Sequence, residues 1–104
     1  MLDKIIPKSS SDPIKCGKKE VQSWGFKHVF TWTDGPNTHY KPHTHNGLTT
    51  HLIINGEFTM CYPEEEPGNK TTFGPGARVD VPAGKVHEVW VGGKGCTYVI
   101  GECA

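Results

Sequence analysis

The sequence predicts an all-β fold, either a small antiparallel β-barrel or a double-sheet jelly roll. Segments rich in β-branched and aromatic residues recur along the chain, and turn residues separate them about every 8 to 12 residues. Thirteen glycines and eight prolines among 104 residues are too many for a helical protein. No stretch keeps the hydrophobic period of a helix, so we expect no helix. A jelly roll or closed barrel would also leave few exposed strand edges in so short a chain.

The first part of the chain differs from the rest. Residues 1–20 are polar and contain lysines, prolines and serines, so we expect an N-terminal arm or a short edge strand there. The β-domain is expected over residues 21–104. Its first strand carries a ring at every second position, the period of a strand with one buried face. These rings belong to Trp24, Phe26, His28, Phe30 and Trp32. Turn residues at 34–37 end this strand.

Further strands follow in quick succession, for a total of eight or nine. We expect them at 39–45, 48–54, 57–62, 71–73, 78–81, 86–91 and 96–100. The dipeptide Asn55-Gly56 is the strongest hairpin signal in the chain, and the glycine-rich segment 92–95 predicts a second tight turn. The segment 63–70 carries three consecutive glutamates between prolines, so we expect a solvent-exposed loop.

Composition narrows the function. Lysine plus arginine and aspartate plus glutamate each total 11, so the formal net charge is zero and neither nucleic acid nor a membrane surface is an expected partner. The chain has no apolar run of membrane-spanning length and no segment like a signal peptide, so we expect a cytoplasmic protein. Its four cysteines form no Cys-x-x-Cys pair. Reduced thiols are expected, with a disulfide framework as the alternative that their even number leaves open.

Three histidines predict a metal site. His43 and His45 are two positions apart, which on a strand places both imidazoles on one face, about 6.6 Å apart along the strand. His87 follows a Pro-x-Gly-x-x turn and begins a later strand. Three imidazoles from two strands would leave open positions on an ion for water or substrate.

At these residues the chain resembles a single-domain cupin. The first cupin motif, His-x-His, three or four residues, Glu, six residues, Gly, matches from His43 to Gly56, with Thr49 in place of the glutamate. The second, Gly, five residues, Pro-x-Gly-x-x-His, three residues, Asn, matches from Gly76 to His87, with Val91 in place of the asparagine. The resemblance covers residues 42–91. It implies a jelly roll or β-barrel with a metal ion in its mouth, and frequently a homodimer.

The missing carboxylate leaves the fourth ligand open. Thr49 is a poor ligand for a divalent ion but suits a hydrogen bond to a metal-bound imidazole. His51 lies two positions further on, on the same strand face, and is a candidate fourth ligand, a polar cavity residue or a structural histidine. Glu88 is expected to point away from His87, and Glu57 is a remote candidate.

The predicted cofactor is one divalent metal ion, with iron as first choice and zinc, nickel, copper or manganese as alternatives. Because histidine ligands are neutral, the ion would keep its charge and attract a small anionic ligand or substrate. We expect a non-haem dioxygenase. The alternatives are a metal-dependent isomerase or lyase, with His51, Tyr40 or Tyr62 as proton shuttle, and a non-enzymatic binding protein.

No catalytic acid or base is assigned from the sequence. Tyr40, Phe58 and Met60 are the expected substrate-contacting residues of the cavity wall. His39 is a second candidate for substrate contact, and His28 is expected to be structural.

Overall fold

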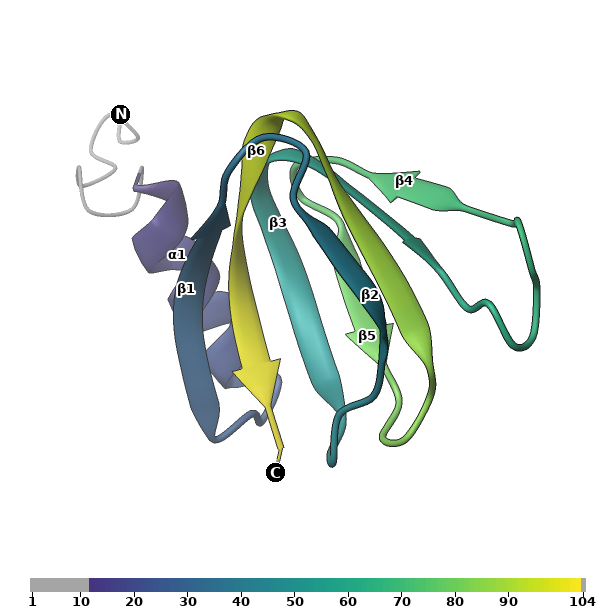
Figure 1. The fold of residues 1–104 in the computed structure, drawn as a ribbon. Coiled ribbons are helices and arrows are strands. Elements are labelled where there is room, and N and C mark those ends of the chain that lie inside the picture. Colours follow the sequence, from purple (N-terminus) through teal and green to yellow (C-terminus); the bar gives the residue numbers. More distant parts are fainter. Residues whose placement is uncertain (1–11, 104) are drawn as a thin grey trace, which may run out of the picture.

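The computed structural model describes residues 12–103 as one helix and six strands (Figure 1). The helix α1 spans Pro13–Ser23. The strands are β1 (His28–Asp34), β2 (His39–His43), β3 (Thr49–Cys61), β4 (Thr71–Phe73), β5 (Arg78–Val81) and β6 (His87–Glu102). Within the described residues, no helix is long and apolar enough to cross a membrane.

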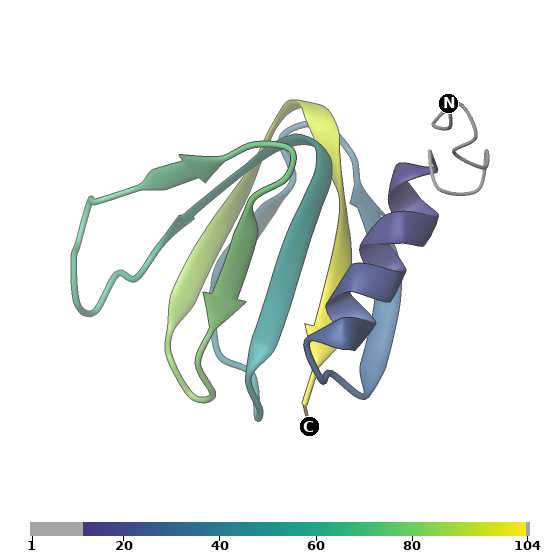
Figure 2. The same ribbon diagram turned by 180° about the vertical axis from the view of Figure 1, so that it is seen from behind.

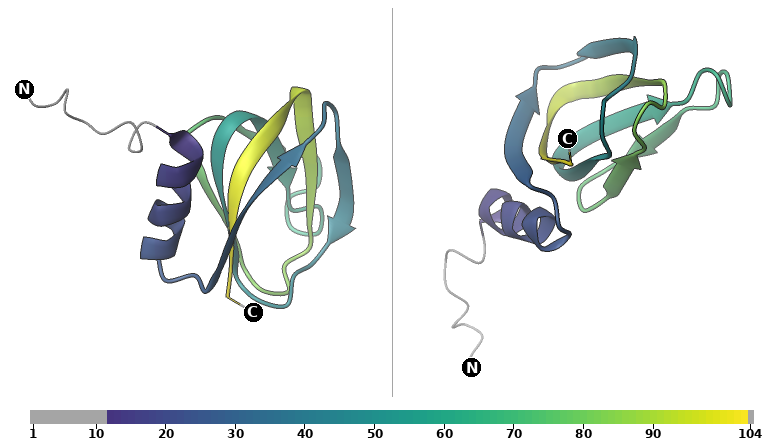
Figure 3. Two further views of the ribbon diagram at one scale, coloured as in Figure 1. Left: turned by 90° about the vertical axis from the view of Figure 1, so that its left-hand side faces the viewer. Right: turned by 90° about the horizontal axis from the view of Figure 1, so that it is seen from below.

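All strand pairs are antiparallel and belong to one curved sheet. The strand order is β1-β6-β3-β4, and β2 and β5 pair with β6 and β3 outside this path. Seen from below in Figure 3, the sheet wraps around an interior without closing into a barrel. The all-β antiparallel prediction is therefore confirmed as a jelly-roll-like fold, whereas closure is not.

Two long bent strands replace four of the predicted short ones. The expected hairpin at Asn55-Gly56 is wrong, because β3 continues through it; the expected turn at 92–95 is wrong, because β6 continues. Both strands change direction at the same level, where Gly56 pairs with Cys96 and the register slips. Gly56 has φ of 83°, and a Cβ atom there would lie 2.1 Å from the Gly95 carbonyl oxygen. The glycines therefore allow two strands to bend together without separating.

The helix α1 contradicts the expectation that no helix forms. Asp12 caps it, because its Oδ1 accepts a hydrogen bond from the Ile14 N–H at 3.0 Å, and Pro13 occupies the first turn. The buried positions Gly17 and Val21 are one helical repeat apart, which is too short a pattern to detect beside a mid-helix glycine. The helix runs across the predicted boundary at residue 20, and the remainder of the expected arm, residues 1–11, lies outside the described residues.

The helix also shortens the predicted first strand. Strand β1 begins at His28, and Trp24 caps the helix instead of continuing the alternation. Phe26 is buried with Val21 in a small core between the helix and the sheet. Figure 2 shows α1 lying along the outer face of the sheet. Gly17 permits this contact, because a Cβ atom there would lie 2.9 Å from the Ile54 Cδ1 atom.

The main core fills the inner face of the sheet. Strands β3 and β6 contribute to both cores in alternation: Ile53 and Tyr98 point inward, whereas their neighbours Leu52 and Val99 point toward the helix. The loop at 63–70 is largely exposed, as predicted. No disulfide joins any of the four cysteines, all of which lie within the described residues. The inner face, shielded from the helix side, is where the candidate site lies.

Candidate metal centre

His43 and His87 face each other across neighbouring strands. His43 ends β2, His87 begins β6, and their Cα atoms are register partners. Directly opposed residues of an antiparallel pair project from the same face, and the two ring centroids are 4.2 Å apart. The register slips between Tyr40 and His43. Tyr40 and His43 are three residues apart, so in a regular strand their side chains would lie on opposite faces. Because of this bulge, both side chains line the same cavity.

His45 reaches the same place from a loop. The sequence predicted it on the strand face with His43, but β2 ends at His43 and His45 follows in the connection to β3. The His45 carbonyl oxygen accepts a hydrogen bond from the Gly84 N–H at 2.9 Å, which ties this loop to the turn before β6. The His45 ring centroid lies 5.1 Å from that of His43 and 4.9 Å from that of His87.

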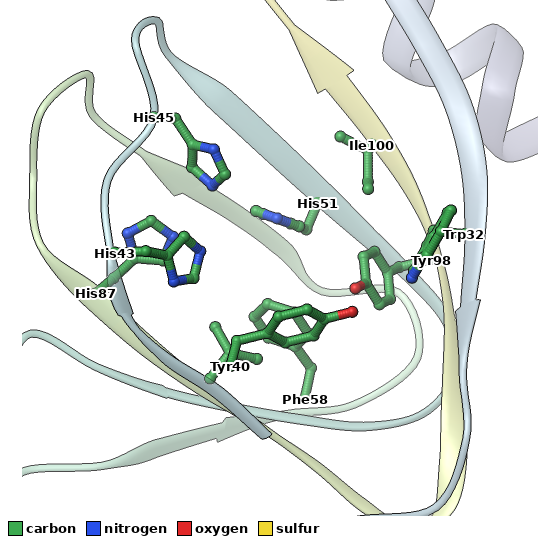
Figure 4. A pocket seen from close by; sticks show the side chains of 10 residues that line it. Trp32, Tyr40, His43, His45, His51, Phe58, His87, Tyr98 and Ile100 are labelled. Atoms are coloured by element: carbon green, nitrogen blue, oxygen red, sulfur yellow. The ribbon is translucent and has the colours of Figure 1, made fainter. Parts of the chain in front are cut away.

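The three imidazoles form a group that can hold one metal ion. Each of His43, His45 and His87 offers a ring nitrogen, and these atoms lie within 4.8 Å of one another. Figure 4 shows the three rings gathered at one end of the cavity. Nitrogens that share one ion at about 2.1 Å lie roughly 3.4 Å apart in tetrahedral geometry, a separation within reach of small ring movements. The three residues therefore fit the metal that a cupin fold implies.

Backbone contacts orient two of the three rings. The His43 Nδ1–H donates to the Lys41 carbonyl oxygen at 2.7 Å, and the His87 Nδ1–H donates to the Lys85 carbonyl oxygen at 3.0 Å. Each contact assigns the proton to Nδ1 and leaves the Nε2 lone pair free as a ligand. Among the described residues, His45 has no such hydrogen-bond partner.

Burial and neighbouring histidines lower the pKa values of two of the three imidazoles. Burial lowers the pKa of His45, and the neighbouring His43 lowers it further. Burial also lowers the pKa of His87, with His43 and His45 acting in the same direction and the contact to Lys85 opposing them. Lowered pKa values favour neutral imidazoles at pH 7, and only neutral imidazole binds a metal ion.

The cavity beside the histidines has a volume of about 240 Å³. Most of its remaining wall is aromatic or aliphatic. The lining residues are Trp32, Tyr40, His43, His45, His51, Phe58, His87, Val89, Tyr98 and Ile100. At about 30 Å³ per water molecule, it has room for roughly eight waters or one small organic molecule.

A buried carboxylate organises the opposite end of the cavity. Asp34 Oδ1 accepts hydrogen bonds from the Tyr40 hydroxyl at 2.5 Å and from the Trp32 indole N–H at 2.9 Å. Asp34 Oδ2 accepts one from the Tyr98 hydroxyl at 2.6 Å. Burial raises the pKa of both phenols, and the bond to Asp34 raises them further. Asp34 and Tyr98 were not predicted as site residues, because they meet only when β1 and β6 pair.

His51 lines the cavity but lies outside the metal-holding group. Its Nδ1–H donates to the Val79 carbonyl oxygen at 3.2 Å, and its ring packs against Phe58 and Tyr98, with centroids 5.1 and 5.6 Å away. Burial lowers its pKa to about 4. Its role as a fourth ligand therefore stays a prediction, and its contacts are those of a polar cavity residue.

The carboxylate that the motif lacks has no substitute at the positions considered from the sequence. The Thr49 hydroxyl is buried and donates to the Gly47 carbonyl oxygen at 3.3 Å. The Glu88 carboxylate bonds to His39 Nε2 at 2.6 Å, away from the cavity, and Glu57 is exposed beside Gly92.

The predicted cavity wall is found in part. Tyr40 and Phe58 line the cavity, whereas Met60 is buried in the core and borders a separate pocket with Tyr62. His39 stacks on Trp90, with centroids 5.5 Å apart, and does not line the cavity.

Comparison with solved structures identifies the fold. A cupin-2 domain protein from Shewanella frigidimarina has 14% identity and a TM-score of 0.60, with 73% of this chain and 69% of that chain covered. A cupin superfamily protein from Desulfitobacterium hafniense has 17% identity and a TM-score of 0.57, with 76% and 81% covered. The polyketide cyclase RemF from Streptomyces resistomycificus has 23% identity and a TM-score of 0.62, with 73% and 54% covered.

These likenesses show that the chain has a cupin fold, as the two motifs predicted. The chain spans only about half the length of the cyclase. No protein-family model matches the sequence, and comparison with curated proteins finds no relative. Fold and site together define a small cupin-fold protein with a candidate three-histidine metal centre.

Proposed function

We propose that this protein is a metal-dependent enzyme of the non-haem dioxygenase type that acts on a small molecule with an anionic group. The observation that carries the proposal is the position of His43, His45 and His87. Their ring nitrogens lie within 4.8 Å of one another at the wall of a cavity large enough for a small molecule. Three protein ligands leave positions free on the ion, which is typical of catalytic rather than structural metal sites.

The bound ion would supply a positive charge that polarises substrate and, if it is iron, the redox chemistry of O2. The chain's own residues supply orientation. The histidines are neutral ligands, so an anionic group of the substrate is attracted to the metal end of the cavity. Phe58, Val89 and Ile100 form apolar wall that takes the body of the substrate and excludes water.

Metal content tests this proposal. The protein purified without chelators, or loaded anaerobically with Fe²⁺, is expected to hold about one ion per chain in a site of three protein ligands. His87→Ala should lower the affinity by more than the roughly 10–100-fold that loss of an outer contact produces. His39→Ala is the matched control, because His39 is an exposed imidazole bonded to Glu88 outside the cavity.

A second variant separates metal binding from folding. His87 is 1% exposed, so its loss also removes core contacts, whereas His45 is half-buried in a loop. His45→Ala should lose the metal with a smaller loss of stability, checked by circular dichroism. Unchanged metal content in both variants would refute the site assignment. Failure of the metal-loaded protein to take up O2 with thiol or diketone substrates would refute the dioxygenase assignment.

A metal-dependent lyase, isomerase or cyclase is the second candidate, and one observation favours it. Tyr40 lies in the cavity between the histidines and the Asp34 carboxylate, to which its hydroxyl donates at 2.5 Å. A phenol hydrogen-bonded to a carboxylate can relay a proton to or from substrate. Activity with Zn²⁺ and without O2 that is lost in Tyr40→Phe would select this candidate.

The resemblance to cupins supports a homodimer, which light scattering would check. The composition supports a cytoplasmic location, which cell fractionation would check. A protein that holds metal but binds no small molecule beside it would support the non-enzymatic alternative.

A further inference from the structure

A second cavity lies on the far side of His45. It has a volume of about 310 Å³ and is lined by Thr44, His45, Asn46, Gly47, Thr49 and Glu102. His45 borders both cavities, whereas His43 and His87 border the first and Glu102 borders the second. His45 is therefore the member of the metal-holding group that the two cavities share.

Glu102 brings a carboxylate next to Thr49, the residue that replaces the glutamate of the cupin motif. It lies on β6 directly opposite Thr49 on β3, as the register pairs their Cα atoms. Opposed residues of an antiparallel pair share a face, and both side chains line the second cavity beside His45. Among the residues that line this cavity in the described structure, Glu102 has the single carboxylate.

The hydrogen bonds of the three ligand histidines show where an acceptor is needed. His43 and His87 each have a carbonyl acceptor on Nδ1, but His45 has no acceptor among the described residues. A metal-bound imidazole carries its proton on the other nitrogen, and that N–H needs an acceptor.

We propose that Glu102 is a positioning residue of the metal centre, whose carboxylate accepts a hydrogen bond from the His45 ring nitrogen that faces away from the ion. The Lys41 carbonyl oxygen accepts from His43, and the Lys85 carbonyl oxygen accepts from His87. The Glu102 carboxylate would be the corresponding acceptor for His45. The inference rests on the proposed metal function. The glutamate of the cupin motif, which Thr49 replaces, would bind the metal directly. Glu102, on the neighbouring strand β6, would instead act through its hydrogen bond to the His45 ring.

The alternative acceptor in the second cavity is the Thr49 hydroxyl. Its donation to the Gly47 carbonyl oxygen at 3.3 Å sets its orientation and leaves its lone pairs free to accept, so it is a neutral rival to the carboxylate. Glu102 is half-buried and has no hydrogen bond from its side chain among the described residues, so its carboxylate is available to turn toward His45. The charge of a carboxylate also makes it the stronger acceptor.

The test is Zn²⁺ affinity of the full chain, measured by competition with a chromophoric chelator. Glu102→Ala, which leaves no acceptor at this position, is expected to weaken binding about 10–100-fold, the usual effect of removing such a partner. Glu88→Ala is the matched control, because it removes the same charge one residue from His87 while its carboxylate bonds to His39. We expect it to change affinity by less than about threefold, as its charge is partly exposed and screened. Thr49→Val tests the rival acceptor and should behave like the control.

Nitrogen-15 NMR of the zinc-loaded protein gives the readout that a general loss of charge or fold would not produce. In the wild type, each ligand histidine should give an imidazole N–H signal that is protected from exchange with water, in addition to the signal of the buried His51. In Glu102→Ala the signal of His45 should be lost while those of His43 and His87 remain. Circular dichroism of each variant confirms that the fold is intact.

Four results would overturn the inference. Equal Zn²⁺ affinity of Glu102→Ala and the wild type would remove the role from Glu102. A drop in Thr49→Val alone would transfer it to the threonine. A carboxylate oxygen in the zinc coordination shell, seen by X-ray absorption, would make Glu102 a ligand instead. A wild-type protein that takes up no metal would refute the proposed function itself and this inference with it.

Discussion

Replacing Asp34 by alanine removes the carboxylate on which three hydrogen bonds of the cavity converge. The donors are the Tyr40 and Tyr98 hydroxyls and the Trp32 indole N–H, at 2.5, 2.6 and 2.9 Å. Asp34 is 6% exposed and Tyr98 is 4% exposed, whereas Trp32 is 49% exposed. The three donors therefore differ in what they lose when the carboxylate is absent.

The exposures set the magnitude. Tyr98 would be left with a buried, unpaired hydroxyl, at a cost of about 1–3 kcal/mol. Trp32 and Tyr40 can turn to water, so each loses about 0.5–1.5 kcal/mol. The carboxylate no longer has to be desolvated, which offsets part of this loss. We expect Asp34→Ala to lower the free energy of unfolding by about 2–4 kcal/mol.

Asp34→Asn gives a sharper test, because the two carboxylate oxygens have different partners. The amide oxygen can take the place of Oδ1 and keep the bonds from Tyr40 and Trp32. The amide NH₂ then faces the Tyr98 hydroxyl, which can accept instead of donate. The loss should fall to about 1 kcal/mol.

Urea denaturation of Asp34→Ala, Tyr98→Phe and the double variant measures the coupling between the two residues. A charged hydrogen bond predicts a coupling energy of about 1.5–3 kcal/mol. Additive losses, or an Asp34→Ala protein within about 0.5 kcal/mol of the wild type, would refute the idea that this carboxylate holds the end of the cavity.

Three other perturbations have defined outcomes. Gly56→Ala should cost more than about 2 kcal/mol in thermal denaturation, since a Cβ atom would lie 2.1 Å from the Gly95 carbonyl oxygen at φ of 83°; a loss below about 1 kcal/mol would contradict the bend. Burial lowers the pKa of His51 from 6.5 to about 4, so the unfolded chain binds the extra proton in that window. Stability of the metal-free protein should therefore fall by up to about 3 kcal/mol as pH drops from 6.5 to 4, and the slope should flatten in His51→Gln; an equal slope would remove this assignment. Burial raises the pKa of the Cys96 thiol to about 11, so at pH 8 a thiol reagent should modify the exposed Cys103 quickly and Cys96 only on unfolding; equal rates would contradict the burial.

Local sequence was sufficient for the antiparallel β fold and for the three histidines of the candidate site. Turn residues and period-two segments act over a few neighbours, so a single sequence displays them. The spacing of His43, His45 and His87 within two motifs was informative, because the two motifs together indicate that distant segments bring their histidines to one place. The same local reasoning failed at Asn55-Gly56, where a hairpin signal lies in the bend of a continuous strand.

The tertiary structure decided everything that depends on pairing between distant segments. Helix α1 forms although Gly17 lowers its propensity, because the glycine lets it lie against the sheet. Asp34 meets the cavity residue Tyr98, and Glu102 comes to lie opposite Thr49, only through the register of β6 with β1 and β3. A one-residue change of register would turn each of these side chains to the opposite face. The sequence alone therefore indicated the three histidines that could hold a metal ion, whereas strand register, which is a property of the whole sheet, decided which carboxylates and phenols lie near them.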